Sequence, residues 1–276
     1  MRYDRKSRQF VSYLSGLSAE GLDFSRDGEW VTYVSLPQAT LWRSRLDGSQ
    51  QLQLTDSSTV VGLPRWSPDG KRIAFSARKP GADWKIFVVS ADGGSPEQVI
   101  SGEGLELDPT WSPDGNFLAY SSDYSDPHSV VHLVDLRTHH VSTVPGSEGL
   151  FSPHWSRDGR FLFAVSHKLQ NPQKLLTYTF TTQKWEQLLL AKSIDYPTWS
   201  RTGEYIHFFD SVEDGTPFYR VRVSDHKLER IGVVSLSRGM AKGQFGQWTG
   251  LAPDDSALLL HDTSFREIYA LDLQLP

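Results

Sequence analysis

The chain has 276 residues, 38% of them hydrophobic and 12% aromatic, and it carries a formal net charge of −5. It contains no cysteine, which excludes disulfides, thiolate nucleophiles and cysteine-based zinc sites. No block of Lys or Arg stands out, and no apolar run approaches the roughly 20 residues of a membrane helix. We therefore expect neither nucleic-acid binding nor membrane insertion by this domain.

A five-residue motif, here called the signature, recurs along the chain. It consists of an aromatic residue, Ser, a variable residue, Asp or Thr, and Gly. Five copies are complete and a sixth is degraded: 24–28, 66–70, 111–115, 155–159, 199–203 and 251–255. The serine positions and then Ala252 are spaced by 42, 45, 44, 44 and 52 residues. A period in the low forties, made of short strands, is typical of the blades of a β-propeller.

The copy at 66–70 shows how one unit is expected to fold. Pro68 fixes the backbone of a turn, Asp69 can bond its own backbone, and Gly70 takes a left-handed conformation. Short runs rich in strand-forming residues predict four strands at 63–67, 72–76, 85–90 and 96–100. Four strands joined by tight turns make one antiparallel blade.

The same order of strands predicts one domain over 1–276, an all-β, six-bladed β-propeller of four-stranded antiparallel blades. The expected blade boundaries are 17–56, 57–101, 102–145, 146–190, 191–234, and 243–275 together with 3–14. In the sixth blade, 257–261 and 267–272 are the predicted second and third strands. Residues 3–13 are predicted as a turn and then the fourth strand. This N-terminal strand would close the ring, because an open blade leaves an unpaired edge.

The repeated aromatic and acidic residues of the signature are expected to be structural. Each of Trp66, Trp111, Trp155 and Trp199 precedes a turn and should pack between neighbouring blades. The signature aspartates lie one to a blade, too far apart to share a calcium ion, which needs six to eight oxygen ligands at one point. We interpret them as turn residues.

The core Trp-Ser-Pro-Asp-Gly, preceded by 108–110 (Asp-Pro-Thr) or 196–198 (Tyr-Pro-Thr), resembles the TolB-type propeller repeat over essentially the whole chain. The resemblance implies a general binding role, toward a protein or peptide partner, but no particular ligand. Bacterial arrays of this type occur alone or as the C-terminal part of larger proteins, after a DNA-binding or kinase domain, and the even repeats look like that fused group. We do not expect a role in the envelope complex of TolB, because the sequence contains no counterpart of the N-terminal domain that TolB carries.

The chain begins as though inside a hairpin, which suggests a segment of a longer bacterial protein. Its compartment, cytoplasmic or periplasmic, would depend on the region upstream. We expect the domain to be a monomer and to act as the sensor or interaction part of that protein. A further interpretation is a bare scaffold for the upstream domain.

No catalytic motif is present in the sequence. It has no Gly-x-Ser-x-Gly elbow, no Gly-x-x-x-x-Gly-Lys run and no His-Glu-x-x-His helix. We therefore expect a non-enzymatic module with no cofactor and no bound metal. The alternative is a propeller hydrolase or lyase with a metal or an acid/base site, which would gather channel residues such as Asp108, His154, Asp195 and Tyr196.

The candidate site is the mouth of the central channel, because the first strand of each blade lines that channel. The residues expected there are Glu20, Glu106, Asp108, Phe151, His154, Asp195, Tyr196 and Trp248. Acidic loops with aromatic neighbours would attract a basic segment of the partner, or a cation.

Residues 235–248 break the repeat and account for the 52-residue step. The segment contains three glycines and is predicted to be an insertion that leads into blade six. Long loops at a channel mouth are more often functional than plain connectors. We expect this one to be a lid or a partner contact.

Overall fold

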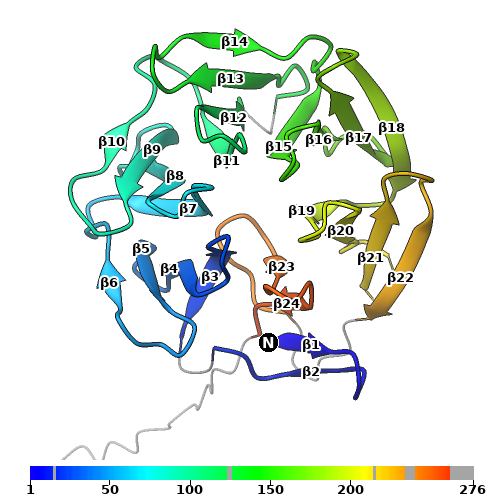
Figure 1. The fold of residues 1–276 in the computed structure, drawn as a ribbon, viewed down its shortest axis with the longest axis horizontal. Helices are drawn as coiled ribbons and strands as arrows, with labels where there is room; N and C mark the ends of the chain where they lie inside the picture. The colour runs from blue at the N-terminus through cyan, green and yellow to red at the C-terminus, as the bar shows by residue number, and fades with distance from the viewer. Residues whose placement is uncertain (15–16, 123–125, 214–215, 234–239, 262–276) are drawn as a thin grey trace, which may run out of the picture.

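The computed structural model describes residues 1–14, 17–122, 126–213, 216–233 and 240–261. These residues form 24 strands in six four-stranded antiparallel sheets, which follow one another around a ring (Figure 1). They include no helix, and so none that could cross a membrane. The predicted fold class, an all-β propeller of six blades, is confirmed.

The first five blades follow the chain order, each from an inner to an outer strand. Blades one and two contain β3 (Ala19–Phe24), β4 (Trp30–Ser35), β5 (Thr40–Arg45), β6 (Leu52–Gln53), β7 (Val60–Trp66), β8 (Arg72–Arg78), β9 (Lys85–Ser90) and β10 (Glu97–Gln98). Blades three and four contain β11 (Leu107–Trp111), β12 (Phe117–Ser121), β13 (Val131–Asp135), β14 (Val141–Thr143), β15 (Leu150–Trp155), β16 (Phe161–Ser166), β17 (Gln173–Thr179) and β18 (Lys184–Ala191). Blade five contains β19 (Asp195–Trp199), β20 (Tyr205–Phe209), β21 (Pro217–Arg222) and β22 (Leu228–Val233).

The signature folds as a turn that the same bonds hold in successive blades. In blade two, Ser67 Oγ donates to Asp69 Oδ1 at 2.6 Å and accepts a hydrogen bond from the Arg72 N–H at 2.9 Å. Both bonds of the hydroxyl recur at Ser25, Ser112 and Ser156. The prediction that the signature aspartates are turn residues is confirmed.

The hydrophobic core lies between neighbouring blades, where the signature tryptophans pack. Trp66 belongs to a cluster that joins blades one and two, and Trp199 to one that joins blades four and five. Two of the four indole N–H groups add inter-blade hydrogen bonds: Trp199 Nε1 donates to the His154 carbonyl at 3.0 Å and Trp111 Nε1 to the Arg65 carbonyl at 3.0 Å. Trp111 and Trp155 pack between blades in the same way, as predicted.

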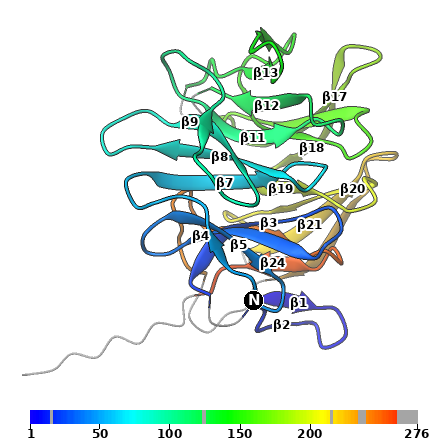
Figure 2. The ribbon, with the colours of Figure 1, turned by 60° about the vertical axis from the view of Figure 1, so that its left-hand side comes forward.

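The N-terminal segment closes the ring and completes the sixth sheet. That sheet has the order β2 (Gln9–Val11), β1 (Arg2–Asp4), β24 (Ala257–Leu259) and β23 (Thr249–Leu251). Figures 1 and 2 show β1 directly beside β24, and Arg2 is paired with Leu258. Ring closure by an N-terminal strand is therefore confirmed.

One detail of this closure differs from the prediction. The N-terminal segment supplies the third strand as well as the fourth. Residues 2–4 form a strand beside β24, whereas the sequence predicts that the segment from residue 3 onward begins with a turn. Tyr3 anchors this strand by packing into a cluster with Phe209 and Phe218 of blade five. The predicted third strand at 267–272 lies outside the residues that the structure describes.

Candidate functional site

The residue four positions before the signature serine is bulged in the first strand of five blades. The strand register shifts at this point in β3, β7, β11, β15 and β19. The bulge residues all have positive φ, between 46° and 62°: Gly21, Leu63, Asp108, Ser152 and Tyr196. A left-handed conformation costs a residue other than glycine on the order of 1–3 kcal/mol. Four blades therefore keep a side chain at a position where glycine would adopt the backbone conformation at a lower energetic cost.

The first strands surround a cavity of about 490 Å³. All four bulge residues that bear side chains line it. Residues two positions further along the strands also line it: Asp23, Arg65, Thr110, His154 and Thr198. A cavity of this size suits a small ligand or a short stretch of polypeptide. The sequence repeat thus places two side chains from each of blades two to five, and one from blade one, at the wall of one channel.

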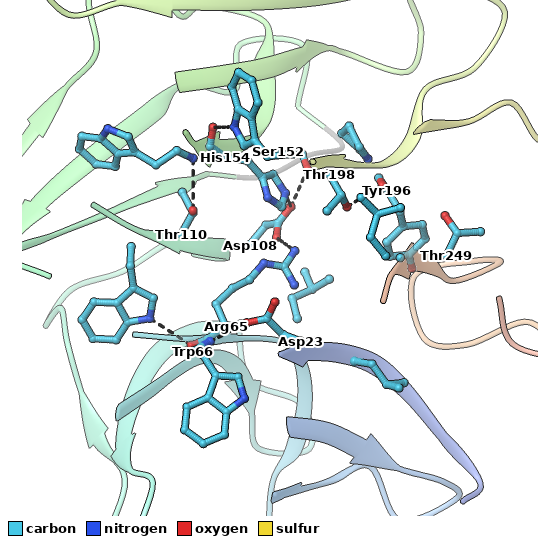
Figure 3. A pocket seen from close by; sticks show the side chains of 18 of the residues that line it. Asp23, Arg65, Trp66, Asp108, Thr110, Ser152, His154, Tyr196, Thr198 and Thr249 are labelled. Carbon is cyan, nitrogen blue, oxygen red and sulfur yellow. Dashed lines mark hydrogen bonds and ion pairs between the residues drawn. The ribbon is translucent and has the colours of Figure 1, made fainter. Parts of the chain in front are cut away.

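Asp108 is the centre of a polar cluster in this wall (Figure 3). Arg65 Nη2 donates to its Oδ1 at 3.1 Å, and Ser152 Oγ donates to its Oδ2 at 2.5 Å. His154 Nε2 lies 3.5 Å from the same Oδ2. Burial by itself raises the pKa of Asp108. The opposite effect of His154, Arg65 and Ser152 is larger and lowers the pKa to about 2. The carboxylate is therefore ionised at neutral pH.

Asp23 is a second carboxylate beside Arg65 (Figure 3). Its Oδ2 accepts a hydrogen bond from the Trp66 N–H at 2.7 Å. Burial raises the pKa of Asp23, against the attraction of Arg65. Burial likewise lowers the pKa of His154, against the attraction of Asp108, so the imidazole is neutral at neutral pH.

The cluster is not arranged as a nucleophile and its base. Ser152 donates its proton to Asp108 and not to His154, so the imidazole does not activate the hydroxyl. Across the described ranges, no group of three or more His, Asp and Glu side chains could hold a metal ion. The cluster instead presents buried charges in a fixed geometry, which can orient a ligand.

Six of the eight predicted site residues line the cavity: Asp108, Phe151, His154, Asp195, Tyr196 and Trp248. Glu20 and Glu106 do not, because other groups hold their carboxylates. Glu106 accepts hydrogen bonds from the Ile86 N–H at 3.1 Å and from Lys85 Nζ at 3.2 Å. Glu20 accepts the Gln244 N–H at 3.1 Å. Glu20 is thus bound to the insertion and Glu106 to β9 of blade two.

The charges of the lining are mixed. Its carboxylates are Asp23, Asp108 and Asp195, and its cationic side chains are Arg26, Arg65, Arg157 and Lys168. Since Arg65 already pairs with Asp108, the wall has no excess of negative charge. The lining therefore gives no support to the expectation of a basic partner segment.

Residues 240–248 of the insertion, here called the strap, cross from blade six to blade two (Figure 1, the orange segment that arches over the centre). Gln244 Nε2 donates to the Val61 carbonyl at 2.9 Å. The Phe245 ring packs on Trp84, with centroids 5.2 Å apart, and lies so close to Gly62 that a Cβ there would be 2.6 Å from it. Gln244 and Phe245 line the cavity. The predicted insertion thus forms part of the channel mouth; residues 234–239 lie outside the described ranges.

Sequence reasoning missed Asp23, Arg65 and Ser152. A signal for them was present, because they occupy the same repeat positions as His154 and Tyr196, two and four residues before the signature serine. These repeat positions can be assigned to the channel only when the bulge is known. Leu63 and Tyr196 are not residue types that predict positive φ, so the sequence did not reveal the bulge.

Comparison with known proteins agrees with this architecture. Residues 21–128 match the family model for the TolB beta propeller domain. The Tol-Pal system protein TolB of Pseudomonas fluorescens is 37% identical over 110 residues, which are 36% of this chain and 24% of that protein. The chain thus matches about a quarter of the length of this curated relative.

Two solved structures extend the likeness to the whole ring. A TolB candidate from Agrobacterium tumefaciens is similar with a TM-score of 0.70 and 18% identity, over 94% of this chain and 95% of that one. An oligogalacturonate lyase in complex with manganese has a TM-score of 0.65 and 16% identity, over 85% and 71%. At these identities the likeness concerns the fold. Residues 21–128 thus match the TolB beta propeller domain, and the repeat continues through a six-bladed propeller.

Proposed function

We propose that the chain is a non-enzymatic binding module that takes a segment of a protein partner into its central channel. The observation that carries this proposal is the retention of Leu63, Asp108, Ser152 and Tyr196 in left-handed bulges. The fold alone would be easier to form with glycine, as blade one shows with Gly21. Strain of this kind is concentrated at functional sites.

The partner segment would enter at the mouth where Phe151, Tyr196 and Lys168 line the cavity. Aromatic rings give large contact area at a low entropic cost, and the Asp108 cluster offers charge in the same cavity. Because the lining carries both signs of charge, we propose a segment of mixed charge in place of the basic one expected from the sequence. The relatives named as Tol-Pal system proteins fit a protein partner of this kind.

We further propose that this propeller is the sensor or interaction part of a larger bacterial protein. The supporting observation is that the matched curated relative is far longer than its matching segment. The strap would then act at the mouth, since Gln244 and Phe245 stand at the wall that the segment must pass.

A phage-displayed library of random dodecapeptides tests the function. Peptides selected on the intact protein should bind Phe151→Ala and Tyr196→Ala at least about tenfold more weakly, because each variant removes an aromatic contact. Leu228→Ala, a change on the outer strand β22 where the side chain is 45% exposed, should leave the affinity unchanged. Selected peptides that ignore both channel variants but lose affinity with Leu228→Ala would refute the channel as the site.

A second candidate function is a propeller lyase. It is favoured by the Asp108, Arg65 and His154 cluster inside a single cavity, and by the fold that the chain shares with an oligogalacturonate lyase. The test is incubation of the protein with oligogalacturonate, with and without manganese. Formation of unsaturated product that His154→Ala abolishes would establish this function and replace the first.

A further inference from the structure

The variable residue of the signature follows the serine directly, at the far end of each first strand. In three blades it is arginine, and in the other three it is proline: Arg26, Arg157 and Arg201 against Pro68, Pro113 and Pro253. At about 3.3 Å per residue, this position lies about 17 Å along the strand from the bulge residue. The variable residues therefore surround the mouth of the channel opposite to the strap.

Two of these arginines line the cavity and lie on facing blades. Arg26 and Arg157 are both lining residues. They follow β3 and β15, which lie on opposite sides of the centre of the ring (Figure 1). Arg201 follows β19, in the blade next to that of Arg157, and its Nη1 lies 3.4 Å from the Pro253 carbonyl. Arg26 and Arg157 thus line one opening, and Arg201 lies close enough to Arg157 to repel its charge.

The guanidinium groups of Arg26 and Arg157 lack the ion-pair partners that other arginines of the described residues have. Within the described ranges, neither Arg26 nor Arg157 forms an ion pair, whereas Arg65 meets Asp108 at 3.1 Å. Asp23 and Asp255 are the two carboxylates that attract the charge of Arg157. Each of them already accepts a hydrogen bond from a backbone N–H at 2.7 Å. Partial burial and repulsion from Arg201 and Arg26 lower the pKa of Arg157, against the attraction of those two carboxylates.

The turn itself does not require arginine. Proline occupies the same place in Pro68 and Pro113, between the same Ser and Asp-Gly. The backbone N–H groups of Arg26 and Arg157 donate no hydrogen bond among the bonds of the described residues, so proline would remove none. Three like charges at one opening repel one another, and an anion would relieve that repulsion.

We propose that Arg26, Arg157 and Arg201 form an oxyanion site at the signature-turn mouth, which holds one phosphate or carboxylate group. Guanidinium groups bind both kinds of oxyanion through paired N–H donors. The site lies at the opposite end of the channel from the proposed entry of the partner segment, and it does not depend on that function.

The test is titration calorimetry at low ionic strength, with inorganic phosphate as one probe and citrate as the other. The double variant Arg26→Pro, Arg157→Pro copies the turns of blades two and three, so it should fold. Its affinity for the bound anion should fall at least about tenfold. The matched control is Arg137→Gln, Arg230→Gln, which removes two exposed charges from outer hairpins and should change the affinity less than about twofold.

Each outcome decides the proposal. Binding of phosphate alone or of citrate alone, lost in the proline variant and kept in the control, supports the site and identifies the anion class. Equal losses in the two double variants would show general charge attraction and overturn it. Absence of binding by either probe to the unaltered protein would overturn it as well, as would unchanged binding by the proline variant whose circular dichroism matches the parent.

Discussion

The signature turns and the channel positions are two regions of the same repeat, only a few residues apart. At the turns, four blades make the same pair of hydroxyl bonds, and the backbone alone explains the residues. At the bulges, each blade bears a different residue, in a conformation that most of them adopt at a cost. Within one chain the repeat is uniform where the fold requires it and diverse where a ligand would lie. This contrast is the strongest argument that the channel has a function.

Asp108 is a channel residue on which the fold also depends, so its removal should have the largest effect. Asp108→Ala would leave the Arg65 guanidinium without its partner and remove the acceptor of Ser152. We expect the free energy of unfolding in urea to fall by about 3–5 kcal/mol. Asp108→Asn, which keeps an acceptor and tolerates positive φ, should lose less. A loss below about 1 kcal/mol for the alanine variant would contradict the cluster as described.

The loss of stability in acid should depend on His207, a histidine inside a blade, and can be compared with that at His154 in the channel. His207 is 3% exposed, and burial, with Arg220 and Arg5, lowers its pKa to about 3. The folded state thus keeps it neutral, while the unfolded state takes up a proton below about pH 6.5. Its stabilising contribution is complete above that pH and is lost as the pH falls toward 3, by up to about 1.4 kcal/mol per pH unit.

Urea unfolding at about pH 7.5 and pH 5 measures this loss in the parent and in His207→Leu. The leucine variant should lose less stability on acidification, because neither ring nitrogen of His207 has a hydrogen-bond partner among the described residues. His154→Leu is the comparison, since burial lowers the pKa of His154 too. Equal acid sensitivity of His207→Leu and the parent would exclude His207 as the source.

The uniform region can be tested by breaking one turn and repairing another. Ser67→Ala removes the acceptor of the Arg72 N–H and should lower the free energy of unfolding by about 1–2 kcal/mol. Ser112→Ala should cost a similar amount, and the two losses should add because the blades are separate. Ala252→Ser restores the hydroxyl that blade six lacks and should raise the stability by up to about 1 kcal/mol. Widely different losses at Ser67 and Ser112 would show that the turns are not equivalent.

The smallest effect on stability is expected at the strap. Gly62→Ala would put a Cβ 2.6 Å from Phe245 Cε2 and should push the strap off blade two. Trypsin should then cut faster after Lys242, which mass spectrometry detects, with a stability loss of at most about 1 kcal/mol. Gly70→Ala is the control for a general loss of stability, since its Cβ would meet nothing within 4 Å but its φ of +69° strains the backbone at a turn away from the strap. Equal cleavage rates in the two variants would mean that the strap is not held at Gly62.

The sequence predicted the ring, the turns and the tryptophan packing, because each depends on residue types that recur at a fixed period. It did not predict β1 beside β24, since the run Arg2–Asp4 is too short and polar to stand out as a strand. It placed Glu20 and Glu106 at the channel because loop acids usually face solvent. Their actual partners come from other blades: the Gln244 N–H for Glu20, and the Ile86 N–H with Lys85 Nζ for Glu106. Single-chain patterns do not show such contacts.

The central claim is that a partner segment contacts the strained bulge residues inside the channel. A photoreactive benzoylphenylalanine in place of Tyr196, and in a second variant in place of Leu228, tests it against the peptide selected by phage display. The account predicts a covalent adduct from position 196 and none from position 228. An adduct from 228 without one from 196 would contradict it.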